Sequence, residues 1–213
     1  MSGTGVWLDN RCTRRHSARM EIWNWFLVGA ASWAVAIILK VLADYMVQRS
    51  NLAELKDWVA AALSGIWSTL CELGLFALAL WFWSATFADA LVAALGAALA
   101  EFIMLLPAVL SAHFAKSQGK TKDKANWRAF FFERSLFMAN HLLSRALVWF
   151  GIMGGAGLAA IGAAMAFFAI TETTQAYGQA RDWDWLNLQT QTIFFGFLIT
   201  IMVAEAALIV WWW

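Results

Sequence analysis

Long apolar runs recur along this chain, each about as long as a lipid bilayer is thick. A helix needs about 20 mostly apolar residues to cross the hydrocarbon core of a membrane. Of the 213 residues, 62% are hydrophobic and 14% are charged, whereas soluble domains carry about 45–50% apolar and about 25% charged residues. We therefore predict an all-α fold, a polytopic transmembrane helical bundle of about six spans. The expected spans cover residues 22–47, 58–83, 87–110, 130–149, 154–170 and 192–213.

A polar and basic segment precedes the first apolar run. Residues 1–21 carry four arginines, as the start of a signal peptide does, but the run that follows is long enough to remain as a span. Translation could also begin at Met20, so we interpret this segment either as a basic N-terminal tail or as sequence that precedes the true start of translation. Residues 22–213 are expected to form a single transmembrane helical domain.

Tryptophan and lysine placement supports these spans. Of the fifteen tryptophans, all but Trp7, Trp33 and Trp67 sit at or near the end of an expected span, and tryptophan prefers the headgroup region of a bilayer. The loop between the third and fourth spans is strongly basic, which predicts a cytoplasmic location for it.

The net charge of +1 gives no reason to expect a nucleic-acid partner.

The fourth run, residues 130–149, carries ionisable groups at membrane depth, where each costs several kcal/mol unless it is paired or faces water. At about 3.6 residues per turn, its polar side chains fall on two neighbouring stripes. The first stripe contains Arg134, His141 and Arg145, and the second contains Glu133, Asn140 and Ser144. We therefore expect this helix to be buried and to face a polar interior.

Three hydrogen-bonding side chains in three different runs lie at similar depth. Glu72 follows Ser68 by four residues, and Glu101 follows Ala97 by the same step. Small residues at this spacing let helices approach closely in lipid, so both carboxylates are expected to face other helices. His141 is near the middle of its own run. We expect the three groups to converge, either as a structural polar network with protonated glutamates or as a functional site.

Other charged residues are assigned more local roles. Lys40 and Asp44 are four residues apart near the end of the first run, which predicts an ion pair whose lysine reaches the interface. Glu205, near the centre of the last run, is expected to join the interior network or to meet a partner subunit. Residues 171–191 are polar and are expected to connect the last two spans outside the membrane.

Several of these stretches together resemble the YhfC-type polytopic proteins. These proteins belong to a broad group of intramembrane proteases with the CAAX prenyl-protease relatives, PrsW and the anterior pharynx-defective subunit of gamma-secretase. The stretches are WFLVGAASWAVAIILK at residues 25–40, STLCELGLFALALW around Glu72, ALGAALAEFIML around Glu101 and ERSLFMANHLLSRALVW from Glu133. The resemblance implies that the catalytic residues are Glu72, Glu101, Glu133 and His141.

The same resemblance implies a cofactor and a reaction. Zinc would be held by Glu72, Glu101 and His141, and a glutamate would activate water for metal-assisted hydrolysis of a membrane-embedded peptide. Glu133, nearer the cytoplasmic end of its span, would be the more water-accessible base. The expected substrate is a transmembrane helix.

Two other classes remain open from the residues themselves. In a non-catalytic scaffold or partner-binding subunit, the polar groups would hold the bundle together and the small-residue stripes would bind a partner helix. In a proton-coupled transporter, the intramembrane acids would relay protons. In each case we expect contact with the lipid bilayer, in a bacterial or archaeal cytoplasmic membrane, and none with nucleic acid.

Overall fold

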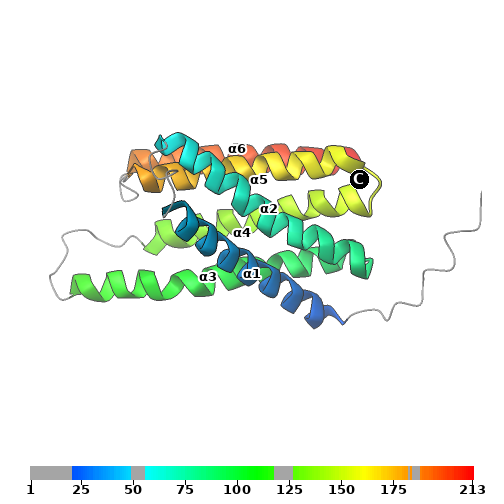
Figure 1. Ribbon diagram of the computed structural model, residues 1–213, viewed down its shortest axis with the longest axis horizontal. Coiled ribbons are helices and arrows are strands. Elements are labelled where there is room, and N and C mark those ends of the chain that lie inside the picture. The colour runs from blue at the N-terminus through cyan, green and yellow to red at the C-terminus, as the bar shows by residue number, and fades with distance from the viewer. Residues whose placement is uncertain (1–20, 49–55, 118–126, 182, 184–187) are drawn as a thin grey trace, which may run out of the picture.

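The chain folds into α-helices, and the computed structural model describes residues 21–48, 56–117, 127–181, 183 and 188–213. No β-strand occurs among these residues, so the all-α prediction is confirmed. The helices of the described part are α1 (Ile22–Gln48), α2 (Asp57–Trp83), α3 (Phe87–Ser117), α4 (Trp127–Ile152), α5 (Gly157–Ala180) and α6 (Leu188–Trp212) (Figure 1).

Five of these helices contain a segment long and apolar enough to cross a membrane. The exception is α4, which has 26 residues and is therefore long enough, but whose polar and charged side chains make it the least hydrophobic of the six helices. The predicted fourth span is confirmed as a helix, and it is the most polar one. The qualifying segments are Ile22–Ala43, Asp57–Trp83, Phe87–Pro107, Gly157–Gly178 and Gln189–Trp212.

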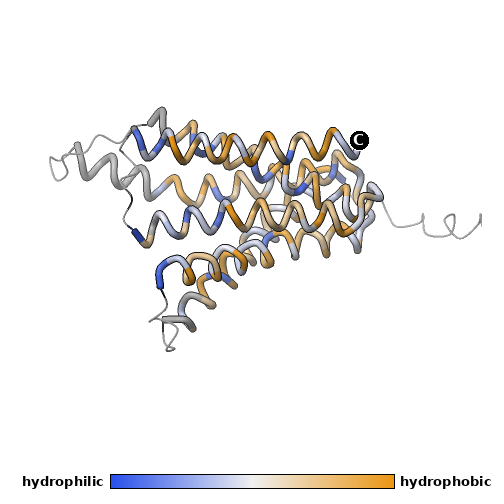
Figure 2. Tube along the Cα trace, turned by 90° about the horizontal axis from the view of Figure 1, so that it is seen from above, coloured by the Kyte–Doolittle hydropathy of each residue, from blue (hydrophilic) through white to orange (hydrophobic). Residues whose placement is uncertain are grey.

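The helix arrangement gives α4 the central position. It packs against α3, α5, α6 and α2, whereas α1 packs mainly against α3 and α2. The longest interfaces pair α2 with α5 and α1 with α3. Hydrophobic residues run along all the helices, with isolated hydrophilic positions among them (Figure 2). The predicted burial of the fourth helix follows from this position.

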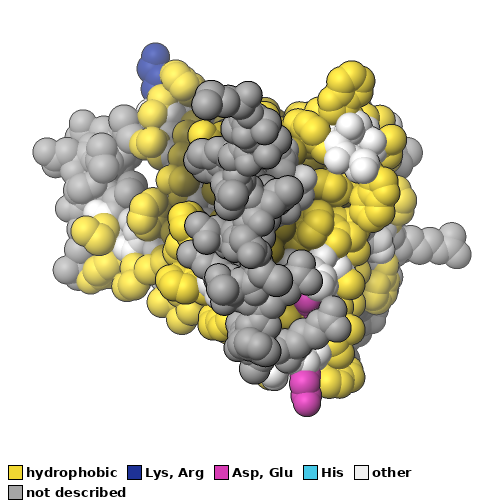
Figure 3. Space-filling model, turned by 90° about the vertical axis from the view of Figure 1, so that its right-hand side faces the viewer, with side chains coloured by type: hydrophobic (Ala, Val, Ile, Leu, Met, Phe, Trp, Pro, Cys, Tyr) yellow, Lys and Arg dark blue, Asp and Glu magenta, His cyan; other side chains and the backbone are white. Residues whose placement is uncertain are grey.

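The outward surface is strongly apolar. Trp81, Phe82, Leu158 and Val210 are each more than 70% exposed, and hydrophobic side chains make up most of the described surface in Figure 3. Contiguous apolar surface of this extent is not tolerated by soluble monomers. Lipid acyl chains are the environment in which such side chains are stable.

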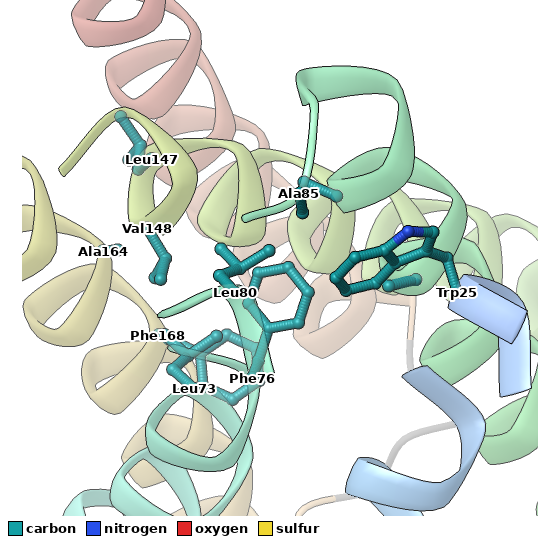
Figure 4. Close-up of a cluster of buried hydrophobic side chains, with 11 residues drawn as sticks. Trp25, Leu73, Phe76, Leu80, Ala85, Leu147, Val148, Ala164 and Phe168 are labelled. Atoms are coloured by element: carbon teal, nitrogen blue, oxygen red, sulfur yellow. The ribbon is translucent and has the colours of Figure 1, made fainter. Parts of the chain in front are cut away.

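A buried apolar cluster fills one half of the bundle. Trp25 of α1 and Phe76 of α2 lie in it beside residues from α4 and α5 (Figure 4). Close packing of α1 on α3 depends on small residues, because a Cβ on Gly29 would overlap the Ala93 carbonyl and one on Gly96 would overlap the Phe26 carbonyl. These contacts confirm that the small-residue side of α3 faces another helix.

One expected boundary is wrong. Helix α5 continues to Ala180, so residues 171–180, predicted as part of a loop, are helical. The hydroxyl of Thr171 donates to the Phe167 carbonyl and that of Thr174 to the Ile170 carbonyl, so these polar groups are satisfied within the helix. The basic tail up to residue 20 and the middle of the basic loop, residues 118–126, lie outside the described part.

Candidate functional site

The first polar stripe of α4 faces the interior. Arg134 is 7% exposed, His141 is 2% exposed and Arg145 is fully buried. A helix turned the other way would place two guanidinium groups in lipid, at a cost of several kcal/mol each. The orientation of α4 therefore follows from its sequence, and these side chains meet acids from neighbouring helices.

His141 is hydrogen-bonded at both ring nitrogens. Its Nε2 lies 2.7 Å from Oε2 of Glu101, and its Nδ1 lies 2.5 Å from a terminal nitrogen of Arg145. A guanidinium has donors only, so Nδ1 must accept the hydrogen bond from Arg145. The ring proton is then on Nε2, which donates to Glu101. The arrangement defines a neutral imidazole in a single tautomer.

Arg145 links His141 to Glu72. Its second terminal nitrogen is 3.5 Å from Oε2 of Glu72, and that oxygen is 3.9 Å from Nδ1 of His141. The guanidinium carbon also lies 5.6 Å from the centre of the Phe76 ring, a contact that helps to stabilise a buried cation. The structure therefore brings together Glu72, Glu101 and His141, with an arginine among them that the sequence interpretation left without a role.

Arg134 connects the same centre to Glu133. Its two terminal nitrogens lie 2.9 Å from Oε1 of Glu101 and 2.7 Å from Oε1 of Glu133. The side chain of Glu133 is 27% exposed, against 5% for Glu72. Glu133 is thus more exposed than Glu72, and it is joined to His141 through Arg134 and Glu101 and not by direct contact.

On the other side of Glu72 the contacts continue to α5 and α1. The Ser68 hydroxyl is 2.8 Å from Oε2 of Glu172 and 3.4 Å from Oε1 of Glu72. The Lys40 ammonium lies 3.1 Å from the same Glu172 oxygen. The predicted role of Lys40 as partner of Asp44 is therefore incomplete, because its ion pair in the described part is with Glu172, and the Asp44 side chain lies outside that part.

Together these contacts form one continuous chain of hydrogen bonds and ion pairs, which we call the His141 network. It links α1, α2, α3, α4 and α5. Its members are Lys40, Ser68, Glu72, Glu101, Glu133, Arg134, His141, Arg145 and Glu172.

The His141 network borders a cavity of about 340 Å³. Its lining contains both polar and apolar side chains, and its three carboxylates all belong to the network. The polar lining consists of Lys40, Ser64, Glu72, Glu101, Glu172 and Gln175, and the apolar lining includes Trp33, Ile37, Val41, Met104 and Leu105.

The possible metal ligands around His141 are not arranged to bind a divalent metal ion. Zinc binds directly to imidazole nitrogen and carboxylate oxygen, but Arg145 is hydrogen-bonded to the His141 nitrogen that faces Glu72, and Glu101 takes the other nitrogen. Among the described residues, no three His, Cys, Asp or Glu side chains are placed to share one metal ion. The predicted ligands Glu72, Glu101 and His141 are thus close together but already paired, and zinc stays a prediction of the resemblance.

Glu205 does not join the His141 network. It accepts a 2.6 Å hydrogen bond from the Ser144 hydroxyl, on the second polar stripe of α4. Both side chains are fully buried. Of the alternatives for this acid, the structure shows a contact within the chain, on the side of α4 that faces α6.

Fold and site together define a multi-pass helical membrane protein with a buried, charged polar network around a central helix. Comparison with protein-family models, with curated proteins and with solved structures finds no match. The function therefore has to be argued from the residues and their geometry.

Proposed function

We propose that this protein binds a membrane-embedded peptide segment in the cavity beside the His141 network. The observation that carries the proposal is the mixed lining of that cavity, which contains carboxylates, a lysine and an amide together with large apolar residues. Its volume of about 340 Å³ is at the lower end of the range for ligand pockets, about 300–1,000 Å³.

The chemistry of such a wall suits an extended backbone inside a membrane. In lipid, an unpaired peptide N–H or C=O costs several kcal/mol, so a helix that unwinds needs partners for those groups. Glu72, Glu101 and Glu172 can accept hydrogen bonds from N–H groups, while Lys40 and Gln175 can donate to carbonyls. The apolar wall then contacts the peptide side chains.

Hydrolysis of the bound peptide is the stronger form of the proposal, supported by the resemblance to intramembrane proteases. A carboxylate on the cavity wall would act as general base and take a proton from the water that attacks the peptide carbonyl carbon, and the Lys40 ammonium would stabilise the developing oxyanion. When the C–N bond breaks, the carboxyl group returns that proton to the leaving nitrogen. No step of this account passes through a metal. Glu101 is less suited than Glu72 to act as base, because both of its oxygens are held by cationic or N–H donors.

The test uses a fluorescent model peptide of about 25 residues with a helix-breaking Gly-Pro step at its centre, sized to span a bilayer. Fluorescence polarisation measures its binding to the purified chain in micelles. We expect Ala176→Trp, which fills the cavity, to weaken binding by at least about tenfold, or about 1.4 kcal/mol. The matched control is Ala159→Trp, which adds the same bulk at an exposed position of the same helix.

Three outcomes separate the candidate functions. Binding that is lost in Ala176→Trp alone supports the proposal, and fragments seen by mass spectrometry add hydrolysis. Equal affinity in both variants contradicts it. Correctly folded protein that never binds the peptide would leave the His141 network with the scaffold role, that of holding five helices together.

Proton-coupled transport is a second candidate, favoured by the continuity of the His141 network. The chain of contacts runs from Lys40, whose side chain is 28% exposed, to Glu133, which is 27% exposed. Networks of acids and histidines at membrane depth relay protons in transporters. Proton flux into liposomes that Glu101→Gln abolishes would support this candidate, whereas flux equal to that of empty liposomes would remove it.

A further inference from the structure

A second buried polar cluster lies on the neighbouring stripe of α4, outside the His141 network. Asn140 and Ser144 are one helical turn apart on that stripe, and Ser144 donates to Oε1 of Glu205 on α6. All three side chains are at most 1% exposed. We call them the Glu205 cluster.

The Glu205 cluster contains polar atoms without partners. Neither Oδ1 nor Nδ2 of Asn140 has a hydrogen bond, and neither has Oε2 of Glu205. Leaving a buried polar group unpaired is destabilising. Unsatisfied groups of this kind are rare in folded proteins and often mark an ion or a water.

The charge of the Glu205 cluster is also uncompensated. Each of the three acids on the cavity wall, Glu72, Glu101 and Glu172, has a lysine or arginine nitrogen within 3.5 Å. Glu205 has no ion pair within the described part of the chain, where its one polar contact is the Ser144 hydroxyl. A carboxylate at this depth has to be neutralised by a proton or by a bound cation.

We propose that the Glu205 cluster binds one sodium ion in exchange for one proton. The Ser144 hydroxyl and the Glu205 carboxylate, which are in contact, offer oxygen ligands that suit a hard cation. The unpaired carbonyl of Asn140, one turn earlier on the same stripe, is the third oxygen that we assign to the site. A single carboxylate balances a single positive charge. A divalent ion would leave a net charge inside the bundle, which is why a monovalent ion is favoured.

The exchange balances as an acid–base reaction. In the sodium-free state, the protonated Glu205 carboxyl carries no charge. When sodium binds, that proton leaves to solvent and the carboxylate pairs with the ion. Sodium affinity therefore falls as the proton concentration rises, because both cations compete for the same oxygens.

The experiment is equilibrium binding of radioactive sodium to the full chain in detergent micelles, with choline chloride keeping the ionic strength constant. We expect one sodium ion per chain and release of one proton. Glu205→Gln, which keeps the size of the side chain, should abolish this binding. Ser144→Ala should weaken it about tenfold, the loss expected for one ligand.

The matched control is Glu172→Gln, which removes a buried acid from the His141 network and should bind one sodium ion like the wild type. Absence of sodium binding in the wild type would overturn the proposal and leave a protonated Glu205. Unchanged binding in Glu205→Gln would overturn it as well. Should that variant fail to fold, undiminished affinity in Ser144→Ala would have the same meaning.

Discussion

His141 of α4 and Glu101 of α3 are joined by a 2.7 Å hydrogen bond between Nε2 and Oε2, and Arg145 occupies the opposite nitrogen of the same ring. The imidazole therefore has one tautomer and one orientation. It connects an acid on α3 to a guanidinium on α4, and through it to Glu72 on α2. The His141 ring thus takes part in the polar contacts that connect α2, α3 and α4.

Removing that ring should be costly. His141→Ala removes one hydrogen bond from Glu101 and one from Arg145, although each keeps its ion-pair partner, and a hydrogen bond to a charged group contributes about 1.5–3 kcal/mol. We expect a lower melting temperature, measured by size-exclusion chromatography after heating in detergent. His141→Gln can still donate to Glu101 and accept from Arg145, so its loss should be smaller. Equal melting temperatures for the wild type and both variants would contradict the assigned hydrogen bonds.

The pair of Arg145 and Glu72 is expected to be coupled. Arg145→Met strands a buried carboxylate, and Glu72→Gln strands a buried guanidinium. The double variant replaces the ion pair with uncharged groups and should be more stable than the sum of the single losses predicts, by about 0.5–3 kcal/mol. Unfolding in increasing concentrations of SDS gives the free energy of unfolding of the wild type, the two single variants and the double variant. Strict additivity would show that the 3.5 Å contact contributes no interaction energy.

The crossing of α1 and α3 should not tolerate a methyl group. Gly29→Ala places a Cβ against the Ala93 backbone, which the two helices can accommodate only by moving apart, at a cost of about 1–3 kcal/mol. Gly162→Ala on α5 is the control, because a Cβ there meets nothing within 4 Å. We expect a lower melting temperature for the first variant and an unchanged or higher one for the second. An equal decrease in melting temperature in both variants would contradict close packing of α1 on α3.

Much of the fold could be predicted from the sequence because lipid imposes a simple constraint. Runs of about 20 apolar residues have to be helices, and these runs predict bounds close to those observed for α1, α2 and α6. Helix α3 begins at the expected residue but continues to Ser117, beyond the expected end at residue 110. The interior position of α4 could also be predicted from the sequence. Its two polar stripes cannot face acyl chains, so the helix had to be surrounded by others.

The partners within the site could not be predicted in the same way. Glu172 is 132 residues from Lys40, and hydrophobic periodicity does not say which helices are neighbours. The end of α5 was taken for a loop because its threonines and glutamine are polar, although they lie on a helix whose inner face meets the cavity. The one available signal was an acid four residues after Phe168, in step with the buried positions of α5.

The role of Arg145 was the other missed element. The resemblance implied that Glu72, Glu101 and His141 are metal ligands, but the stripe that carries His141 also carries two arginines. Their positive charges balance Glu72 and Glu101 within the chain. Counting the cations on the same stripe as the acids would have indicated an ion-pair network. The roles of Glu72, Glu101, Glu133 and His141 in catalysis stay predictions.

The most direct measurement of the central claim is photo-cross-linking of the model peptide with a diazirine side chain beside its Gly-Pro step. After irradiation, mass spectrometry of the digested complex locates the adducts on this chain. We predict adducts at the cavity wall, on Trp33, Met104 or Leu105. Adducts confined to lipid-facing residues such as Leu158 and Val203 would contradict peptide binding beside the His141 network.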